Sequence, residues 1–138
     1  MRMPPKGVCV FDIDDTLTCG DPERAIRHCK ERGYEVAINT ARPVRWLNHD
    51  LKGLGLPNPD DATFIHNPKS LTQTPSQRAR AKGVAMDTLA QHFNTKNLIL
   101  FDDLQINVDA AVKRGYRARR VSADGACGIS LEDLAQVQ

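Results

Sequence analysis

Several features that would mark other protein classes are absent or scarce in this sequence of 138 residues. The start of the chain leads into a short apolar run at 8–11, so we expect neither a signal-peptide core nor a membrane span. The formal net charge is only +2, which does not by itself indicate a nucleic-acid-binding surface. No repeat, linker or low-complexity segment interrupts the chain. These absences favour a single compact domain over residues 1–138 in the cytoplasm.

Cysteine is also scarce, and its spacing excludes the common metal sites. The four cysteines form no CxxC pair and lack zinc-ligand spacing: Cys9, Cys19, Cys29 and Cys127. Cys9 lies in an apolar segment, where cysteine acts as a small hydrophobic residue. We therefore expect reduced thiols, in keeping with a cytoplasmic location.

Apolar segments of strand length alternate with segments of helical periodicity along the chain. We expect strands at 8–11, 35–40, 63–66, 98–101 and 118–121, and helices at 21–32, 44–54, 77–93, 104–114 and 130–137. This alternation predicts an α/β fold, with a central parallel sheet of about five strands covered by helices on both faces. In such sheets, ligands bind beyond the carboxyl ends of the strands.

Polar side chains follow three of the expected strands. The clusters after the first, second and fourth strands are Asp12 with Asp14 and Asp15, residues 39–42, and Asp102 with Asp103. One such cluster alone is typical of a polar turn or a helix cap. Three clusters at the same edge of a sheet favour an active site. Carboxylates held close together repel, so a cation or a reaction is expected to require them.

The spacing of the first cluster suits phosphoryl transfer. Carboxylates from two strands form a hard oxygen site of the kind that Mg²⁺ prefers. A carboxylate beside a bound metal can attack phosphorus, and a second one two residues later can serve as general acid and then base. Asp12 and Asp14 have this spacing. They suit these roles only if the chain leaves the strand conformation at Ile13, because alternate strand residues otherwise share one face.

These residues carry a resemblance to a known family. DIDDTL at 12–17 resembles the DxDx[T/V] signature of the haloacid dehalogenase superfamily of phosphotransfer enzymes. INTAR at 38–42 resembles the second motif, KGVAMDTLAQHF from Lys82 the third, and residues 98–115 the fourth. The resemblance implies a Rossmann-like three-layer α/β/α domain and a Mg²⁺-dependent phosphomonoester hydrolase.

The resemblance also implies catalytic roles for the matching residues. Asp12 would attack phosphorus, and Asp14 would act as general acid and then base. Thr40 and Lys82 would bind the oxygens of the transferring phosphoryl group. Lys69 is a rival for the lysine of the third motif, but Lys82 opens a clear helix and is favoured.

The metal would be held by carboxylates of the first and fourth motifs. The resemblance implies Mg²⁺ bound by Asp12, Asp14 and Asp103. Asp102 and Asn107 would orient the lysine or the metal-bound waters. This chain has Asp102 where many members have glycine, and Asn107 where many have aspartate. The division of roles between these two residues therefore stays open.

The sequence offers no room for a cap domain, the inserted unit that closes over the site in members that act on small metabolites. Neither the segment after Thr18 nor residues 55–77 could form one. An uncapped site is open to bulky substrates, and this minimal form resembles phosphatases of nucleic-acid ends and phosphoproteins. Residues 98–121 are loosely similar to polynucleotide 3′-phosphatase domains. Arg42 would bind substrate phosphate, with a surface ion pair as the equal alternative.

We therefore expect a phosphatase whose substrate is macromolecular or polyanionic, such as a nucleic-acid 3′-phosphate end. Arginines expected to flank the open rim are Arg42, Arg45, Arg78 and Arg80. One alternative is a phosphatase of sugars or nucleotides that receives a cap from a partner subunit. Another is a catalytically silent phosphate-binding or scaffold module, against which Asp14 argues, because binding needs no acid–base residue. The oligomeric state stays open.

Overall fold

The computed structural model describes residues 4–40, 63–66, 73–123 and 125–138. Several expectations fall outside these residues and stay predictions. They concern the helix at 44–54, the side chains of Arg42, Arg45 and Lys69, and the absence of a cap, since most of residues 55–77 lie in the same gaps.

The strands lie side by side in one parallel sheet, with the order β3-β2-β1-β4-β5. Their bounds are β1 Gly7–Phe11, β2 Tyr34–Thr40, β3 Thr63–His66, β4 Leu98–Asp102 and β5 Arg117–Arg120. Every residue of β1 and β4 is buried, because these central strands are covered on both faces. The expected α/β fold with a parallel sheet is confirmed.

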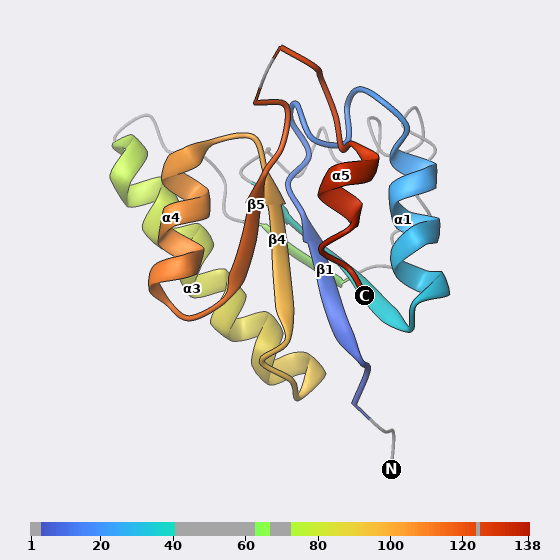
Figure 1. Cartoon of the computed structure of the whole chain (residues 1–138). Helices are drawn as coiled ribbons and strands as arrows, with labels where there is room; N and C mark the ends of the chain where they lie inside the picture. Colours follow the sequence, from blue (N-terminus) through green and yellow to red (C-terminus); the bar gives the residue numbers. More distant parts are fainter. Residues whose placement is uncertain (1–3, 41–62, 67–72, 124) are drawn as a thin grey trace.

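Helices cover both faces of this sheet (Figure 1). Their bounds are α1 Pro22–Glu31, α3 Pro75–Phe93, α4 Gln105–Lys113 and α5 Leu131–Leu134. Helices α3 and α4 pack on one face, and α1 and α5 lie on the other (Figure 1). Side chains cap three of these helices, as polar residues at helix starts commonly do: Asp21 before α1, Thr74 before α3 and Ser130 before α5.

The two faces of the sheet form two hydrophobic cores because side chains alternate along each strand. Val8, Val10 and Leu100 face α3 and α4, and they pack in one cluster with Met86 of α3. The alternate residues face α1 and α5, and among them Phe11 stacks on Phe101 with ring centroids 5.3 Å apart. This packing fixes the carboxyl ends of β1 and β4 next to each other.

The cysteines differ from the sequence prediction. Cys9 of β1 is bonded to Cys29 of α1, and Cys19 is bonded to Cys127, so reduced thiols were a wrong expectation. The Cα atoms are 6.5 Å and 5.6 Å apart, within the usual range for disulfides. Sequence spacing gave no signal because folding, rather than proximity along the chain, brings each pair together.

Within the described ranges, no helix combines the length and the apolar character that crossing a membrane requires.

Candidate active site

The chain turns sharply after β1, which brings two carboxylates to one place. The strand ends at Phe11, and the carbonyl of Ile13 accepts hydrogen bonds from the backbone N–H groups of residues 16–18. Ile13 itself is buried in the core, whereas Asp14 is exposed. Asp12 and Asp14 both line the same cavity. The departure from strand conformation that their two-residue spacing requires is therefore present.

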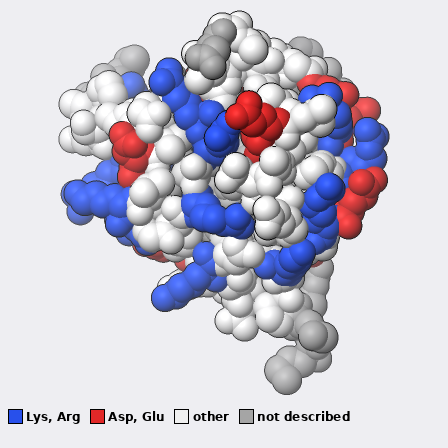
Figure 2. Space-filling model, in the orientation of Figure 1, with Lys and Arg blue, Asp and Glu red and all other residues white. Residues whose placement is uncertain are grey.

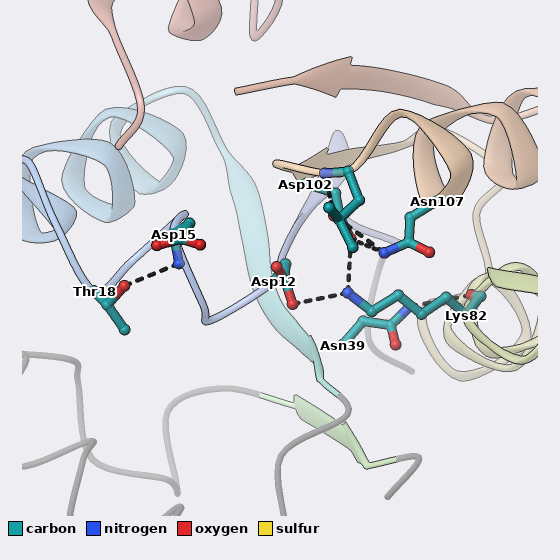
Figure 3. A network of polar contacts seen from close by, with 8 residues as sticks. Asp12, Asp15, Thr18, Asn39, Lys82, Asp102 and Asn107 are labelled. Carbon is teal, nitrogen blue, oxygen red and sulfur yellow. Dashed lines mark hydrogen bonds and ion pairs between the residues drawn. The ribbon is translucent and has the colours of Figure 1, made fainter. Parts of the chain in front are cut away.

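Lys82 of α3 joins the first and fourth strands through its ammonium group (Figure 3). Its Nζ donates to Asp12 Oδ1 at 2.7 Å and to Asp102 Oδ2 at 2.6 Å. All three side chains are buried, with at most 10% of each exposed. A buried charge needs a partner, and here one cation lies between two carboxylates.

Besides Lys82, two other residues donate hydrogen bonds to the Asp102 carboxylate. Asn107 Nδ2 lies 3.2 Å from each carboxylate oxygen, and the backbone N–H of Leu104 donates to Oδ1 at 3.0 Å. The Asp102 side chain is fully buried, so these bonds replace the water it has lost. Asp102 thus orients Lys82, and Asn107 orients Asp102.

Two pKa shifts follow from this burial. Burial raises the pKa of Asp12 to about 7; Lys82 opposes this shift, and the charge of Asp102 adds to it. Burial lowers the pKa of Lys82, but the attraction of Asp12 and Asp102 outweighs it, so the net shift is upward. Lys82 therefore stays protonated at neutral pH. Asp12 needs further positive charge nearby to stay ionised at the same pH.

Carboxylates suited to a metal ion cluster here. Asp12, Asp102 and Asp103 each offer an oxygen, and these oxygens lie within 4.8 Å of one another. The hard oxygen donors suit Mg²⁺, which usually takes one or two protein carboxylates and completes its shell with water and phosphate oxygens. The oxygens of Asp102 are already occupied by Lys82, Asn107 and Leu104, which leaves Asp12 and Asp103 as the better ligands. The residues present therefore fit Mg²⁺.

A cavity of about 250 Å³ opens over this cluster. Its lining comes from the first two turns of α3, the start of α4 and the turn after β1. Its described lining is Asp12, Asp14, Asp15, Gln73, Pro75, Arg78, Ala81, Lys82, Asp103, Leu104, Ile106 and Asn107. The sequence prediction had named five of these as catalytic, metal-binding or supporting, and Arg78 as a rim residue.

Gly83 allows the two helices beside the cavity to approach closely. A Cβ at this position would lie 3.0 Å from Arg114 Cδ and 3.1 Å from Arg114 Nε, both tight contacts, and 3.4 Å from the carbonyl oxygen of Ala110. The close packing of α3 on α4 that results holds Lys82 within reach of Asp102.

The second-motif residues lie at the neighbouring strand end. Thr40 is buried at the carboxyl end of β2, next to β1 in the sheet. Among the described residues, it is not part of the cavity lining. Arg42 lies outside those residues. The expected phosphate contacts of Thr40 and Arg42 therefore stay predictions.

Sequence reasoning gave no specific role to two residues that shape the site, although it placed Asn39 in the second polar cluster. Asn39 Nδ2 donates to the backbone carbonyl of Lys82 at 3.1 Å, which fixes the turn of α3 that carries the lysine (Figure 3). Leu104 uses its N–H to hold Asp102. The first contact joins positions 43 residues apart, and the second is made by the backbone, so neither leaves a residue pattern in the sequence.

The loop with Asp14 and Asp15 is braced from the far end of the chain. Asp15 adopts a positive φ of 56°, and its N–H donates to Thr18 Oγ1 at 2.9 Å. Ser122 Oγ donates to the carbonyl of Asp15 at 2.6 Å. The Cys19–Cys127 disulfide joins the same two segments covalently. Two links to the far end of the chain and one contact within the loop thus hold this exposed acidic segment.

Comparison with known proteins gives a fold relationship only. Neither a protein-family model nor a curated protein matches this chain. A solved structure of phosphoserine phosphatase in its apo form is 16% identical, with a TM-score of 0.60 over 82% of this chain and 86% of that one. An uncharacterized protein from Corynebacterium glutamicum is 17% identical, with a TM-score of 0.57 over 82% of each chain.

A third structure illustrates how widely the fold is shared. UDP-GlcNAc 2-epimerase from Methanocaldococcus jannaschii is 11% identical, with a TM-score of 0.54 over 84% of this chain and 31% of that one. At such identities the likeness shows the fold alone, a Rossmann-like α/β domain.

Proposed function

We propose that this chain is a Mg²⁺-dependent phosphomonoester hydrolase that acts through an aspartyl-phosphate intermediate. The observation that carries the proposal is the buried bridge of Lys82 between Asp12 and Asp102, facing a cavity that Asp14 also lines. The fold likeness to phosphoserine phosphatase supports the same reaction class. A passive phosphate-binding module would need the cation but no nucleophile and no acid–base group.

The reaction follows from these positions in two steps. A carboxylate oxygen of Asp12 forms a bond to phosphorus while the bond to the leaving oxygen breaks, and Asp14 gives that oxygen its proton. Asp14, now ionised, takes a proton from a water molecule that attacks the phosphorus. The Asp12–phosphorus bond breaks, and inorganic phosphate leaves. Both carboxyl groups return to their starting state.

Lys82 and the metal supply positive charge in this scheme. The Lys82 ammonium lies beside the nucleophilic oxygen, where it favours the ionised form of Asp12 and offsets charge on the phosphoryl group. Mg²⁺ held by Asp12 and Asp103 would neutralise phosphoryl oxygens and, with Lys82, oppose the rise in the pKa of Asp12 that burial causes. Asp14, which the sequence prediction included among the metal ligands, lies outside the described carboxylate cluster.

We further propose that the phosphate is carried by a macromolecule or polyanion, such as the 3′ end of a nucleic acid. Arg78 lines the cavity and supports this, because its Nη1 donates to the carbonyl of Gln73 at 2.9 Å and is held at the rim. Basic side chains are also spread over the face around β5 (Figure 2). Two arginines are paired with carboxylates, however: Arg114 just after α4 with Asp87, and Arg119 of β5 with Asp133.

The experiment is hydrolysis of a generic aryl phosphate with Mg²⁺ and with a chelator, for the parent and Asp14→Asn proteins. Mg²⁺-dependent turnover is expected, and the substitution should slow it by about 10²–10⁴-fold. Chelator-resistant turnover, or parental turnover by Asp14→Asn, would refute the mechanism.

The carrier is tested with 3′- and 5′-phosphorylated oligonucleotides, phosphopeptides and sugar phosphates at two salt concentrations. A polyanionic carrier should lose affinity as salt rises.

A further inference from the structure

Two apolar side chains lie at the mouth of the cavity that holds the catalytic cluster. Leu104 precedes α4 and Ile106 is in its first turn, and they are 52% and 39% exposed. Both line the cavity together with Asp12 and Lys82. The described residues leave three other large apolar side chains exposed, and none of them lines this cavity: Val84, Val112 and Leu131.

Leu104 is an unfavourable choice for its structural position. It is the N-cap residue of α4, where serine, threonine, aspartate or asparagine would bond a free N–H group of the first turn. Leu104 makes no such side-chain bond, whereas α1, α3 and α5 all begin with a polar cap. Stability therefore does not account for leucine at 104. A contact with a ligand in the cavity would account for it.

Residues of α3 line the same cavity. They include Pro75 and Arg78, which share the lining with Leu104 and Ile106. Arg78 is anchored through Nη1 to the carbonyl of Gln73, so its planar guanidinium is held at the rim. A cavity lined by apolar side chains and by a guanidinium plane suits a flat ring, because the ring can pack on both. A small polar carrier such as a serine side chain would gain nothing from Leu104 and Ile106.

We propose that this part of the cavity forms a slot that binds the base of the terminal nucleotide that carries the phosphate, and that Leu104 and Ile106 determine this preference. The inference rests on the proposed function, in which the substrate is a phosphorylated nucleic-acid end. The phosphate lies over Asp12 and Lys82, and the adjoining base packs against the α4 wall. Arg78 also contacts the base.

The test compares two 3′-phosphorylated tetranucleotides, one with a terminal base and one with an abasic terminal sugar. The parent protein should prefer the first by tenfold or more in kcat/KM. Leu104→Ser and Ile106→Ser should reduce this preference to about twofold, mainly through a lower kcat/KM for the base-bearing substrate. Val112→Ser is the matched control, since Val112 is an equally exposed residue of the same helix, and it should keep the full preference.

A second readout separates binding from a structural role. Serine at 104 provides the missing cap, so Leu104→Ser should melt about 2–5 °C higher than the parent while it loses the preference. The proposal is overturned if the parent treats both substrates alike. It is equally overturned if Leu104→Ser impairs both substrates to the same extent, or if a phosphotyrosine peptide is preferred over the tetranucleotide.

Binding provides an answer that does not depend on hydrolysis. The same pair of tetranucleotides can be titrated calorimetrically into Asp12→Asn protein, with and without Leu104→Ser. Tighter binding of the base-bearing tetranucleotide, lost with Leu104→Ser, supports the slot even if the parent hydrolyses neither substrate and the proposed reaction fails. Equal binding of the two overturns the slot even if hydrolysis is observed.

Discussion

Lys82 Nζ lies 2.6 Å from Asp102 Oδ2, and the carboxylate it contacts has no exposed surface. The same ammonium lies 2.7 Å from Asp12 Oδ1. One buried cation therefore holds two carboxylates that would repel each other without it. The stability of the domain and the ionisation of the proposed nucleophile depend on the same side chain.

Replacing Lys82 with methionine should destabilise the fold as well as abolish activity. The substitution leaves Asp12 and Asp102 buried without a cation, a change that typically costs about 3–5 kcal/mol. Urea unfolding would measure it, with the exposed Lys113→Met as the control. Adding Asp102→Asn to Lys82→Met should restore part of the stability, because one unpaired charge is removed. A loss below 1 kcal/mol would show that the bridge is not a structural element.

Asp103 should control the metal requirement. Asp103→Ala removes one of the two carboxylates best placed to bind Mg²⁺, so a higher Mg²⁺ concentration should be needed for half-maximal hydrolysis. Asp109→Ala, on the exposed side of α4, should leave that concentration unchanged. Ca²⁺ should support little turnover, since its larger and looser shell spoils the geometry. Equal activity with Mg²⁺, Ca²⁺ and chelator would contradict metal dependence.

The two disulfides can be checked by titration of thiols in denaturant. Protein unfolded without reductant should show no reactive thiol, and four should appear after reduction. Cys127→Ser should lower the free energy of unfolding by about 2–4 kcal/mol, because the lost bridge closes a loop of 108 residues. Four reactive thiols before reduction would show that the reduced form, expected from the sequence, is the native one.

Tyr116 should make stability depend on pH in the alkaline range. Burial and the hydrogen bond to Asp87 raise the pKa of Tyr116 to about 12. Because the folded state favours the neutral phenol, this stabilisation is complete below pH 10 and is lost as the pH rises through 12. Tyr116→Phe should therefore be about 1 kcal/mol less stable than the parent at pH 8, with the difference shrinking toward pH 12. A difference that does not change over this range would refute the shift.

The sequence predicted the parts of the fold that depend on local pattern. Apolar runs marked the strands, and residues such as Asp21 and Ser130 marked helix starts, because a cap acts within one turn. The edge where the site lies followed from the parallel sheet, since Asp12 and Asp102 end neighbouring strands.

What the sequence did not predict depends on contacts between distant segments. Nothing local to Cys19 indicates a bond to Cys127, and nothing near Asn39 indicates contact with the turn that carries Lys82. The cavity wall at Leu104 was missed because an apolar residue looks the same in sequence whether it is buried or exposed. Only the packing of α3 on α4 shows which apolar residues of these helices are buried and which are exposed.

The central claim is that Asp12 is the nucleophile, and the most direct measurement is the turnover of Asp12→Asn with an aryl phosphate and Mg²⁺. Asparagine keeps the shape of the side chain but cannot attack phosphorus. We expect no detectable turnover, together with a circular dichroism spectrum like that of the parent, which would show that the fold is retained. Turnover within tenfold of the parent by a folded Asp12→Asn protein would contradict the account.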